Sequence, residues 1–201
     1  MKKFTIVLLL LILACSAVFA DSYYEKGDTM FSVNAGITYP GFLFFPNRTS
    51  GDKFVAGVSG THMAIGGYAS LSYQVFLNRS LALGGQIGYA FNNSQAGIIF
   101  ATVPITGKLT FVPVQSSTFD LKFSFNGGVS VLRYNTNRFL SPFASITVNP
   151  TYYFNNSWGV GIEAGMWAWY ESYPESSSNN KYEDTCLGAM VPITISLTYR
   201  H

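Results

Sequence analysis

The final stretch of the chain, residues 187–199, alternates between apolar side chains and mostly small or polar ones. The apolar positions are Leu187, Ala189, Val191, Ile193, Ile195, Leu197 and Tyr199. Because successive side chains of a β-strand point to opposite faces, this period predicts one long strand with a single apolar face. A globular strand typically has about 5–6 residues, whereas a tilted strand that crosses a bilayer needs about 9–11. The stretch is therefore long enough to span a membrane as a strand.

The same alternation recurs in earlier segments, so we expect eight strands, at residues 29–39, 62–76, 81–91, 98–111, 119–132, 142–154, 158–170 and 187–199. After residue 20, no apolar run approaches the roughly 18 residues of a membrane helix. Charged residues make up only 11% of the chain, well below the roughly 25% of soluble domains. The sequence predicts an all-β fold, an eight-stranded antiparallel up-and-down transmembrane β-barrel. Three prolines inside these segments (Pro104, Pro150 and Pro192) are expected near strand ends or at bulges.

Connection lengths and aromatic residues favour a membrane barrel over a soluble sheet. The connections at 77–80, 112–118 and 155–157 are short, those at 41–60, 133–141 and 171–184 are longer, and only 92–96 breaks the alternation. Outer-membrane barrels have short periplasmic turns, longer outer loops and an aromatic girdle at each interface. We expect the girdle near the short turns to include Tyr73, Phe111, Tyr152, Trp158 and Tyr199, and the outer girdle to include Tyr39, Tyr89, Phe91, Tyr134, Trp167, Trp169 and Tyr170.

Residues 1–20 have the pattern of an export signal, and residues 21–201 are expected to form a single barrel domain. Lys2 and Lys3 precede an apolar segment, and a small-residue cleavage site ends at Ala20. An uncleaved anchor and lipoprotein processing at Cys15 are the alternatives. If Cys15 is removed with the signal, Cys186 has no partner for an internal disulfide. We therefore expect the mature chain to lie in the outer membrane of a bacterial cell.

The chain resembles the small eight-stranded outer-membrane barrels, the group that contains OmpX, OmpW and the OmpA transmembrane domain. The resemblance covers residues 28–199 and rests on the alternation and on the repeated turn sequences Phe76-Leu77-Asn78-Arg79-Ser80 and Phe154-Asn155-Asn156-Ser157. It implies periplasmic termini, longer connections outside the cell, and outer-membrane lipid and the barrel-assembly machinery as partners. The chain departs from the group in ending Tyr199-Arg200-His201 rather than on phenylalanine.

Charged residues within the expected strands lie on the polar face, which a membrane barrel turns inward. An eight-stranded barrel is just wide enough for side chains to fill its interior, and buried charges require partners. We therefore expect Lys108, Lys122 and Glu163 to form a polar network in the lumen. The expected role is structural, with a gate for solutes as the alternative.

Motifs for catalysis, metal binding and nucleic-acid binding are weak. A histidine near a serine could imitate the lipid-modifying enzymes of this fold, but His62 with Ser59 or Ser50 lacks a carboxylate placed to orient it. The spacing of Cys186 and the two histidines does not suit a metal. Beyond the signal the chain is neutral, so no basic stripe favours nucleic acid. We expect no enzyme activity, cofactor or metal.

The leading functional hypothesis is a non-catalytic outer-membrane barrel that acts through its outer loops, in adhesion, in interaction with an extracellular or host ligand, or in envelope support. Passage of small hydrophobic molecules is the first alternative, with Trp167 and Trp169 at an entrance. The second alternative is a soluble or lipid-anchored barrel that binds an apolar ligand inside. That alternative requires the apolar faces to point inward.

Overall fold

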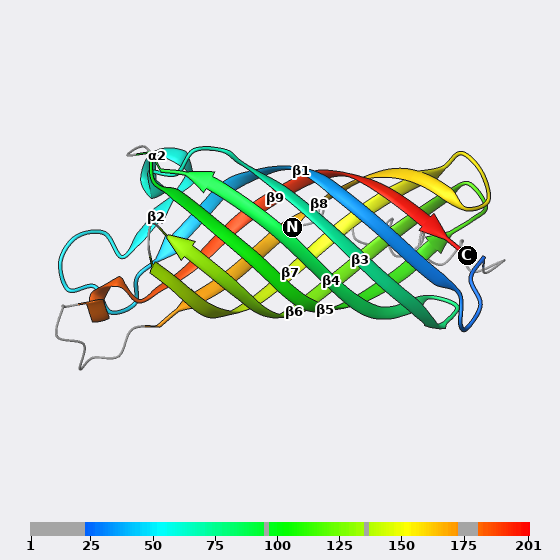
Figure 1. Cartoon of the computed structure of the whole chain (residues 1–201), viewed down its shortest axis with the longest axis horizontal. Helices are drawn as coiled ribbons and strands as arrows, with labels where there is room; N and C mark the ends of the chain where they lie inside the picture. The colour runs from blue at the N-terminus through cyan, green and yellow to red at the C-terminus, as the bar shows by residue number, and fades with distance from the viewer. Residues whose placement is uncertain (1–22, 95–96, 135–136, 173–180) are drawn as a thin grey trace, which may run out of the picture.

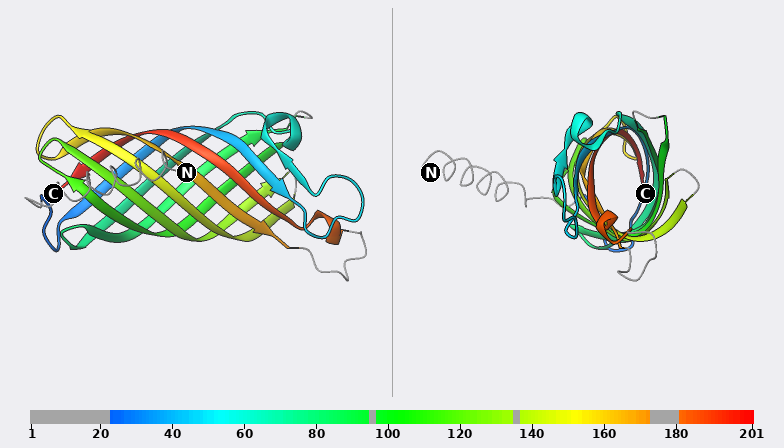
Figure 2. Two further views of the ribbon diagram at one scale, coloured as in Figure 1. Left: turned by 180° about the vertical axis from the view of Figure 1, so that it is seen from behind. Right: turned by 90° about the vertical axis from the view of Figure 1, so that its left-hand side faces the viewer.

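The protein is a closed antiparallel barrel, seen from the side in Figure 1. The computed structural model describes residues 23–94, 97–134, 137–172 and 181–201. Within these ranges the barrel wall has eight strands, β1 (Thr29–Phe44), β3 (Gly66–Asn78), β4 (Leu81–Asn93), β5 (Ile99–Gln115), β6 (Phe119–Tyr134), β7 (Asn137–Tyr153), β8 (Trp158–Glu171) and β9 (Cys186–Arg200). Consecutive strands pair, and β1 pairs with β9 to close the ring, which the end view of Figure 2 shows. The predicted eight-stranded up-and-down barrel is confirmed.

Three short elements lie at the long-loop end of the barrel, on the left of Figure 1. Strand β2 (Phe54–Ala56) pairs with the end of β1, helix α2 (Gly57–Thr61) follows it, and the 3₁₀ helix η1 (Lys181–Asp184) precedes β9. None of the helices in the described ranges is long and apolar enough to cross a membrane. The opposite end carries the short turns and the chain terminus at His201, where the Thr29 N–H donates to the His201 carbonyl oxygen.

The two faces of each strand differ as the alternation predicts. On β9 the outward side chains of Ile193 and Ile195 are 44% and 66% exposed, whereas the inward Ser196 is fully buried. The same division holds on β6, where Phe125 is 53% exposed and Asn126 is 1% exposed. An apolar exterior suits contact with the hydrocarbon of a membrane. The soluble alternative, which places the apolar faces inward, is therefore wrong.

The short turns are built by side chains that cap backbone amides. The side-chain Oδ1 atom of Asn78 accepts hydrogen bonds from the N–H groups of Ser80 and Leu81, each at 2.9 Å. Asn155 does the same for Ser157 at 2.9 Å and Trp158 at 2.7 Å. These are Asx turns, which satisfy amides that the ladder leaves unpaired. The repeated turn sequence thus has a direct structural role.

Inward-facing glycines let the barrel wall curve tightly. A Cβ atom added to Gly84 would collide with the carbonyl oxygen of Tyr73 on the neighbouring strand, and one added to Gly128 would collide with that of Ile105. The adjacent outward glycine, Gly127, would meet only the Phe125 ring at 3.5 Å. Glycine kinks are a known means of bending and closing sheets. A similar close approach occurs at Gly36 and Gly165.

Pro104 and Pro192 lie in strand interiors, so their predicted placement near strand ends or at bulges is wrong, whereas Pro150 lies three residues before the end of β7. Pro104, Pro150 and Pro192 lie within β5, β7 and β9. Each coincides with a gap in the ladder on one side, in the β4–β5, β7–β8 and β8–β9 pairings respectively. Proline lacks the N–H that a ladder bond requires, so the pairing lapses on that side. It continues on the other side, where Pro104 faces Ser130 and Pro192 faces Thr38.

The predicted outer connection at 133–141 is also wrong, because its described residues, 133–134 and 137–141, are strand. β6 and β7 continue beyond the predicted ends, and their register runs through Arg133↔Arg138 and Tyr134↔Asn137. The polar composition suggested a loop, yet a strand that rises beyond the bilayer can carry polar side chains in water. The expected signal segment and its cleavage site at Ala20 lie outside the described residues, and the expected connection at 171–184 is described only in part.

Candidate functional site: the filled lumen and the long-loop surface

A buried ion pair lies inside the barrel. Lys108 on β5 and Glu163 on β8 approach to 3.4 Å between Nζ and Oε2, and their side chains are 5% and 4% exposed. The Lys108 ammonium also donates to Gln86 Oε1 at 3.0 Å. Burying charge is costly unless it is paired and hydrogen-bonded, and this arrangement supplies both. Two of the three predicted network residues thus meet across the lumen.

The third residue of that predicted network, Lys122, lies elsewhere in the lumen. Its ammonium donates to Thr198 Oγ1 at 3.2 Å and lies 4.0 Å from the Met30 sulfur. The side chain is only 3% exposed. Around it, lumen hydroxyls and amides form short local hydrogen bonds, such as those of Thr110 with Ser124 and Gln74. The polar lumen therefore consists of several connected groups rather than one three-residue cluster.

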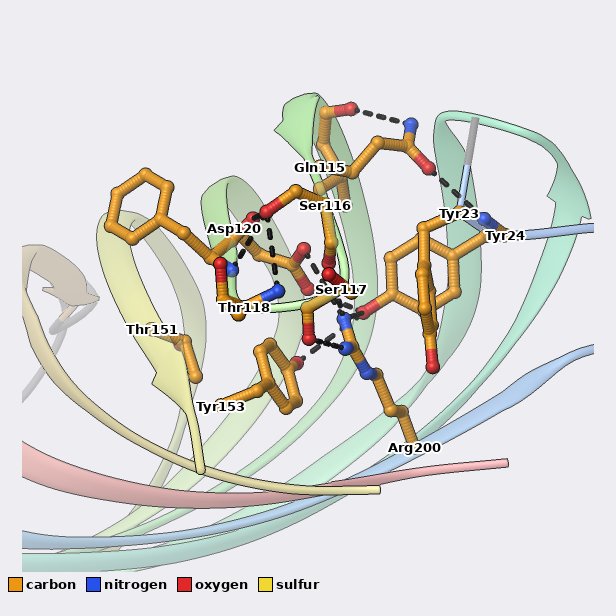
Figure 3. A network of polar contacts seen from close by, with 12 residues as sticks. Tyr23, Tyr24, Gln115, Ser116, Ser117, Thr118, Asp120, Thr151, Tyr153 and Arg200 are labelled. Carbon is orange, nitrogen blue, oxygen red and sulfur yellow. Dashed lines mark hydrogen bonds and ion pairs between the residues drawn. The ribbon is translucent and has the colours of Figure 1, made fainter. Parts of the chain in front are cut away.

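A cluster centred on Arg200, drawn in Figure 3, lies at the short-turn end of the lumen. The guanidinium lies between aromatic rings, with its Cζ atom 3.7 Å from the Tyr23 ring centroid and 3.4 Å from that of Tyr153. Its Nη1 atom is 3.5 Å from Asp120 Oδ1. Its N–H groups also donate to the backbone carbonyls of Ser116, Ser117 and Asn156, at 3.1, 2.6 and 3.0 Å. A single side chain thus ties the last strand to two turns.

The N-terminal lead-in enters the same cluster through Tyr24. Its ring stacks on Phe76 with centroids 3.9 Å apart, and its hydroxyl donates to Asp120 Oδ2. Burial, with the nearby Asp120 carboxylate, raises the pKa of the Tyr24 phenol well above its ordinary value. The phenol therefore remains protonated and able to donate to the carboxylate. This cluster, which we call the Arg200 cluster (Tyr23, Tyr24, Asp120, Tyr153 and Arg200), was missed by the sequence interpretation, which treated Arg200 only as a departure from the usual chain ending.

The long-loop end of the lumen is filled by apolar side chains instead. We call this group the aromatic cluster; its buried members are Tyr68, Ala90, Phe100, Leu132, Phe143, Trp167, Trp169 and Met190. Trp167 and Trp169 are 2% and 3% exposed, so their predicted place in the outer girdle is wrong. They share the inward parity of Glu163 on β8, a signal that was present in the sequence. The Gln86 amide donates to the Tyr68 hydroxyl at 2.7 Å, which joins the aromatic cluster to the Lys108–Glu163 pair.

The residues expected in the girdle near the short turns face outward. Tyr73, Phe111, Tyr152 and Trp158 are 54%, 46%, 61% and 39% exposed. Tyr199 is half-buried, because its ring packs on Trp158 with centroids 4.9 Å apart. All five lie toward the short-turn ends of their strands. Their exposed rings suit the boundary between hydrocarbon and water.

The long-loop end presents an ordered surface outside the barrel. The loop after β1 contacts the segment before β9, since the Asn47 amide donates to the Tyr182 carbonyl at 3.3 Å and the Thr49 hydroxyl donates to Glu183. Within the loop, the Phe45 N–H donates to the Lys53 carbonyl at 2.8 Å. Arg48 also lies over the Phe45 ring at 3.8 Å. These contacts dock the two outer segments on each other.

Groups for catalysis or metal binding are sparse in the described ranges. His62 is an exposed residue that ends α2 in a left-handed conformation, with φ of 56°. Ser50 and Ser59, which the sequence offered as its partners, are exposed loop or helix residues. Cys186 is buried. The residues that the structure describes include no group of three or more histidine, cysteine or acidic side chains able to hold a metal.

Comparisons with known proteins agree with this architecture. The fold is similar to Neisserial surface protein A, with a TM-score of 0.52 over 87% of this chain and 99% of that one, at 8% identity. It is similar to the outer-membrane protein OprG of Pseudomonas aeruginosa, with a TM-score of 0.51 over 90% and 99% of the two chains, at 10% identity. At these identities the likeness concerns the fold alone.

Sequence comparison gives two further matches. An uncharacterised protein of Borreliella burgdorferi is 26% identical over an alignment of 132 residues, and the match covers 55% of this chain and 62% of that relative. The match thus spans less than two thirds of the relative. A protein-family model matches residues 15–199, nearly the whole chain. The chain thus has the fold of the small eight-stranded outer-membrane β-barrels.

Proposed function

We propose that this protein is a non-catalytic barrel of the bacterial outer membrane that acts through its long-loop end. The observation that supports this most directly is that buried side chains occupy the lumen at three levels. The Arg200 cluster occupies one end, the Lys108–Glu163 pair lies between, and the aromatic cluster occupies the other end. Interaction with other molecules then falls to the outer surface, where residues 45–53 and 182–183 are docked on each other.

The first experiment tests whether solutes pass. The full chain is folded into proteoliposomes, and their swelling in a solution of a small sugar is measured, with an established porin as the positive control. If side chains block the lumen, the proteoliposomes should swell no faster than liposomes without protein. Sugar-dependent swelling with the wild-type chain would contradict the proposal.

The second experiment tests the loop surface. Residues 46–53 are replaced by a glycine–serine segment of equal length, and bacteria that express either form are compared for attachment to cultured host cells and for envelope integrity. Both forms should show the same difference in gel migration between unboiled and boiled samples, which shows that both barrels are folded. The proposal expects attachment or envelope integrity to fall only in the loop-replaced form. Equal behaviour of wild-type, loop-replaced and vector-only cells would overturn it.

A second candidate function is passage of small hydrophobic molecules, and the aromatic cluster is the observation that favours it. Its inward rings, including Tyr68, Trp167 and Phe143, would offer an apolar surface to such a molecule at the long-loop entrance. These rings are closely packed, so entry requires at least one of them to move. Uptake of a fluorescent naphthylamine is compared between cells with the wild-type chain and vector-only cells. Faster uptake with the wild-type chain would favour passage, and equal uptake would favour action through the loops.

A further inference from the structure

Buried oxygen atoms without a hydrogen-bond partner lie inside the barrel, in the part of the chain that the structure describes. Three of them belong to Asn34 on β1, Asn126 on β6 and Thr147 on β7, whose side chains are 0%, 1% and 8% exposed. A fourth, Asp120 Oδ1, already lies in the ion pair with Arg200. Leaving a buried polar atom unpaired costs free energy, so folded proteins supply such atoms with a partner. The first three atoms therefore call for a partner that is not a side chain.

These three residues lie at one level of the barrel. A row of paired residues that starts at Thr198 passes once around the wall and returns to β9 at Gly188, ten residues nearer the long-loop end. With a rise of about 3.3 Å per residue and a tilt of about 40°, each step to the next strand climbs about 3 Å along the barrel axis. On this scale the three Cα atoms lie within about 4 Å of the height of Lys108 and Glu163. The unpaired atoms and the buried ion pair thus share one level.

Two of the three residues lie between the strands that carry the ion pair. Lys108 on β5 and Glu163 on β8 approach each other across β6 and β7, which carry Asn126 and Thr147. These two residues are diagonal neighbours, because the β6–β7 register pairs Asn126 with Ser145, two residues from Thr147. Diagonal side chains on one face have Cβ atoms about 7–8 Å apart, a separation that small polar molecules can bridge. The Asn126 amide donates to Ser145 at 2.8 Å, so its Oδ1 atom remains available.

The wall around Asn34 leaves room at the same level. The other inward residues of this wall, on β9, β1 and β3, are short; they are Thr194, Ser196, Gly36, Ser70 and Ser72. The Asn34 amide donates to Ser70 at 3.1 Å, which leaves its Oδ1 atom unbonded. The interior of an eight-stranded barrel is just wide enough to be filled by side chains. Short side chains on one wall therefore leave space for small polar molecules.

We propose that the lumen binds ordered water molecules at this level, held by Asn34 Oδ1, Asn126 Oδ1 and Thr147 Oγ1 and in contact with the Lys108–Glu163 pair. Water donates to amide oxygens and both donates to and accepts from a hydroxyl, so it satisfies all three groups. A cation would suit the oxygen atoms, but Lys108 and Lys122 outnumber Glu163 among the buried charges nearest this level. The same waters hydrate the ion pair, which lowers the cost of burying its charges.

The first test is water-edited solid-state NMR on the full wild-type chain in lipid bilayers, which measures how fast magnetisation from water reaches each side chain. Asn155, exposed in a short turn, is the wet control, and Ile146, which faces the lipid, is the dry control. We expect the side-chain signals of Asn34, Asn126 and Thr147 to grow at a rate closer to that of Asn155. A rate closer to that of Ile146 would overturn the proposal.

The second test is the variant Thr147→Val, which replaces a hydroxyl with a methyl group of similar size. A hydroxyl that binds water loses that bond, so the midpoint of urea unfolding in detergent should fall. A dry, unpaired hydroxyl predicts the opposite sign, because its removal relieves the cost of burying it. The control is Thr110→Val, which removes hydrogen bonds to Gln74 and Ser124 and should lower the midpoint in either case. A midpoint of Thr147→Val that is unchanged or raised would contradict bound water.

The third test separates water from a bound cation. The wild-type chain is unfolded by urea in sodium, potassium or N-methylglucamine chloride at equal ionic strength. Bound water predicts the same midpoint in all three salts. A higher midpoint in sodium or potassium would identify a cation as the ligand of these oxygen atoms, and the proposal would then be wrong.

Discussion

Arg200 and Asp120 form an ion pair inside the short-turn end of the barrel, with Nη1 and Oδ1 3.5 Å apart and side chains 1% and 0% exposed. The pair joins the last residue of β9 to the second residue of β6. Tyr24 donates to the same carboxylate, so the N-terminal lead-in depends on it too. Three distant parts of the chain therefore converge on one pair of charges.

Replacing Arg200 should weaken the barrel strongly. Arg200→Met leaves Asp120 as a buried charge without its ion-pair partner, which typically costs about 3–5 kcal/mol. The loss of stability is measured by urea unfolding in detergent, with the folded fraction read from the gel migration of unboiled samples. The double variant Asp120→Asn/Arg200→Met should lose less than the sum of the single variants. Strict additivity would mean that the two side chains do not act as a pair.

Glu163 should hold Lys108 in its charged, buried state. We expect Glu163→Leu to lower the unfolding temperature of the folded barrel in detergent, since the Lys108 ammonium loses its carboxylate. The matched control is Glu25→Leu, because Glu25 is exposed outside the barrel wall. Combining Glu163→Leu with Lys108→Met should restore much of the lost stability. An unchanged unfolding temperature in Glu163→Leu would contradict the assignment of a stabilising role to this pair.

Adjacent glycines on β6 should differ sharply in their tolerance of alanine. The Gly128→Ala methyl group would collide with the Ile105 carbonyl oxygen, whereas that of Gly127→Ala would make ordinary contact with Phe125. We expect Gly128→Ala to cost about 1–3 kcal/mol through forced backbone shifts. Gly127→Ala should remain within about 0.5 kcal/mol of the wild type. Equilibrium unfolding of both variants gives the comparison, and equal costs would speak against curvature as the role of Gly128.

Trp167 should be a main support of the aromatic cluster. Its ring contacts Tyr68 at 4.7 Å and Phe143 at 5.7 Å between centroids. Trp167→Ala should cost about 3–5 kcal/mol by leaving a cavity. The outward Trp158 provides the control, since Trp158→Ala empties no space inside the barrel. Unfolding in detergent should therefore rank Trp167→Ala as the more damaging variant, and the reverse order would contradict a packed cluster.

The alternation in the sequence was sufficient to predict the fold and the orientation of its faces. Period two identifies which residues share a face, and low charge with long strands indicates which face meets lipid. It also placed Lys108, Lys122 and Glu163 on the inner face. The parity of β8 would have placed Trp167 and Trp169 inside as well, but aromatic composition suggested a girdle.

Other features depended on pairing between distant strands. Alternation assigns a residue to a face but gives no register, so it could not show that Lys108 meets Glu163 while Lys122 meets Thr198. Polar composition concealed the continuation of β6 and β7, and with it the cross-strand pair Arg133 and Arg138.

The sequence by itself determined that this chain forms an all-β barrel with an apolar exterior, because side-chain alternation is a local property of each strand. Only the tertiary structure decided which side chains meet in the lumen and at its ends. Arg200, Asp120 and Tyr24 become neighbours because closure of the ring brings the lead-in, β6 and β9 to one end. Contacts of that kind arise from strand register and tilt around the whole barrel, and no short segment of the sequence encodes them.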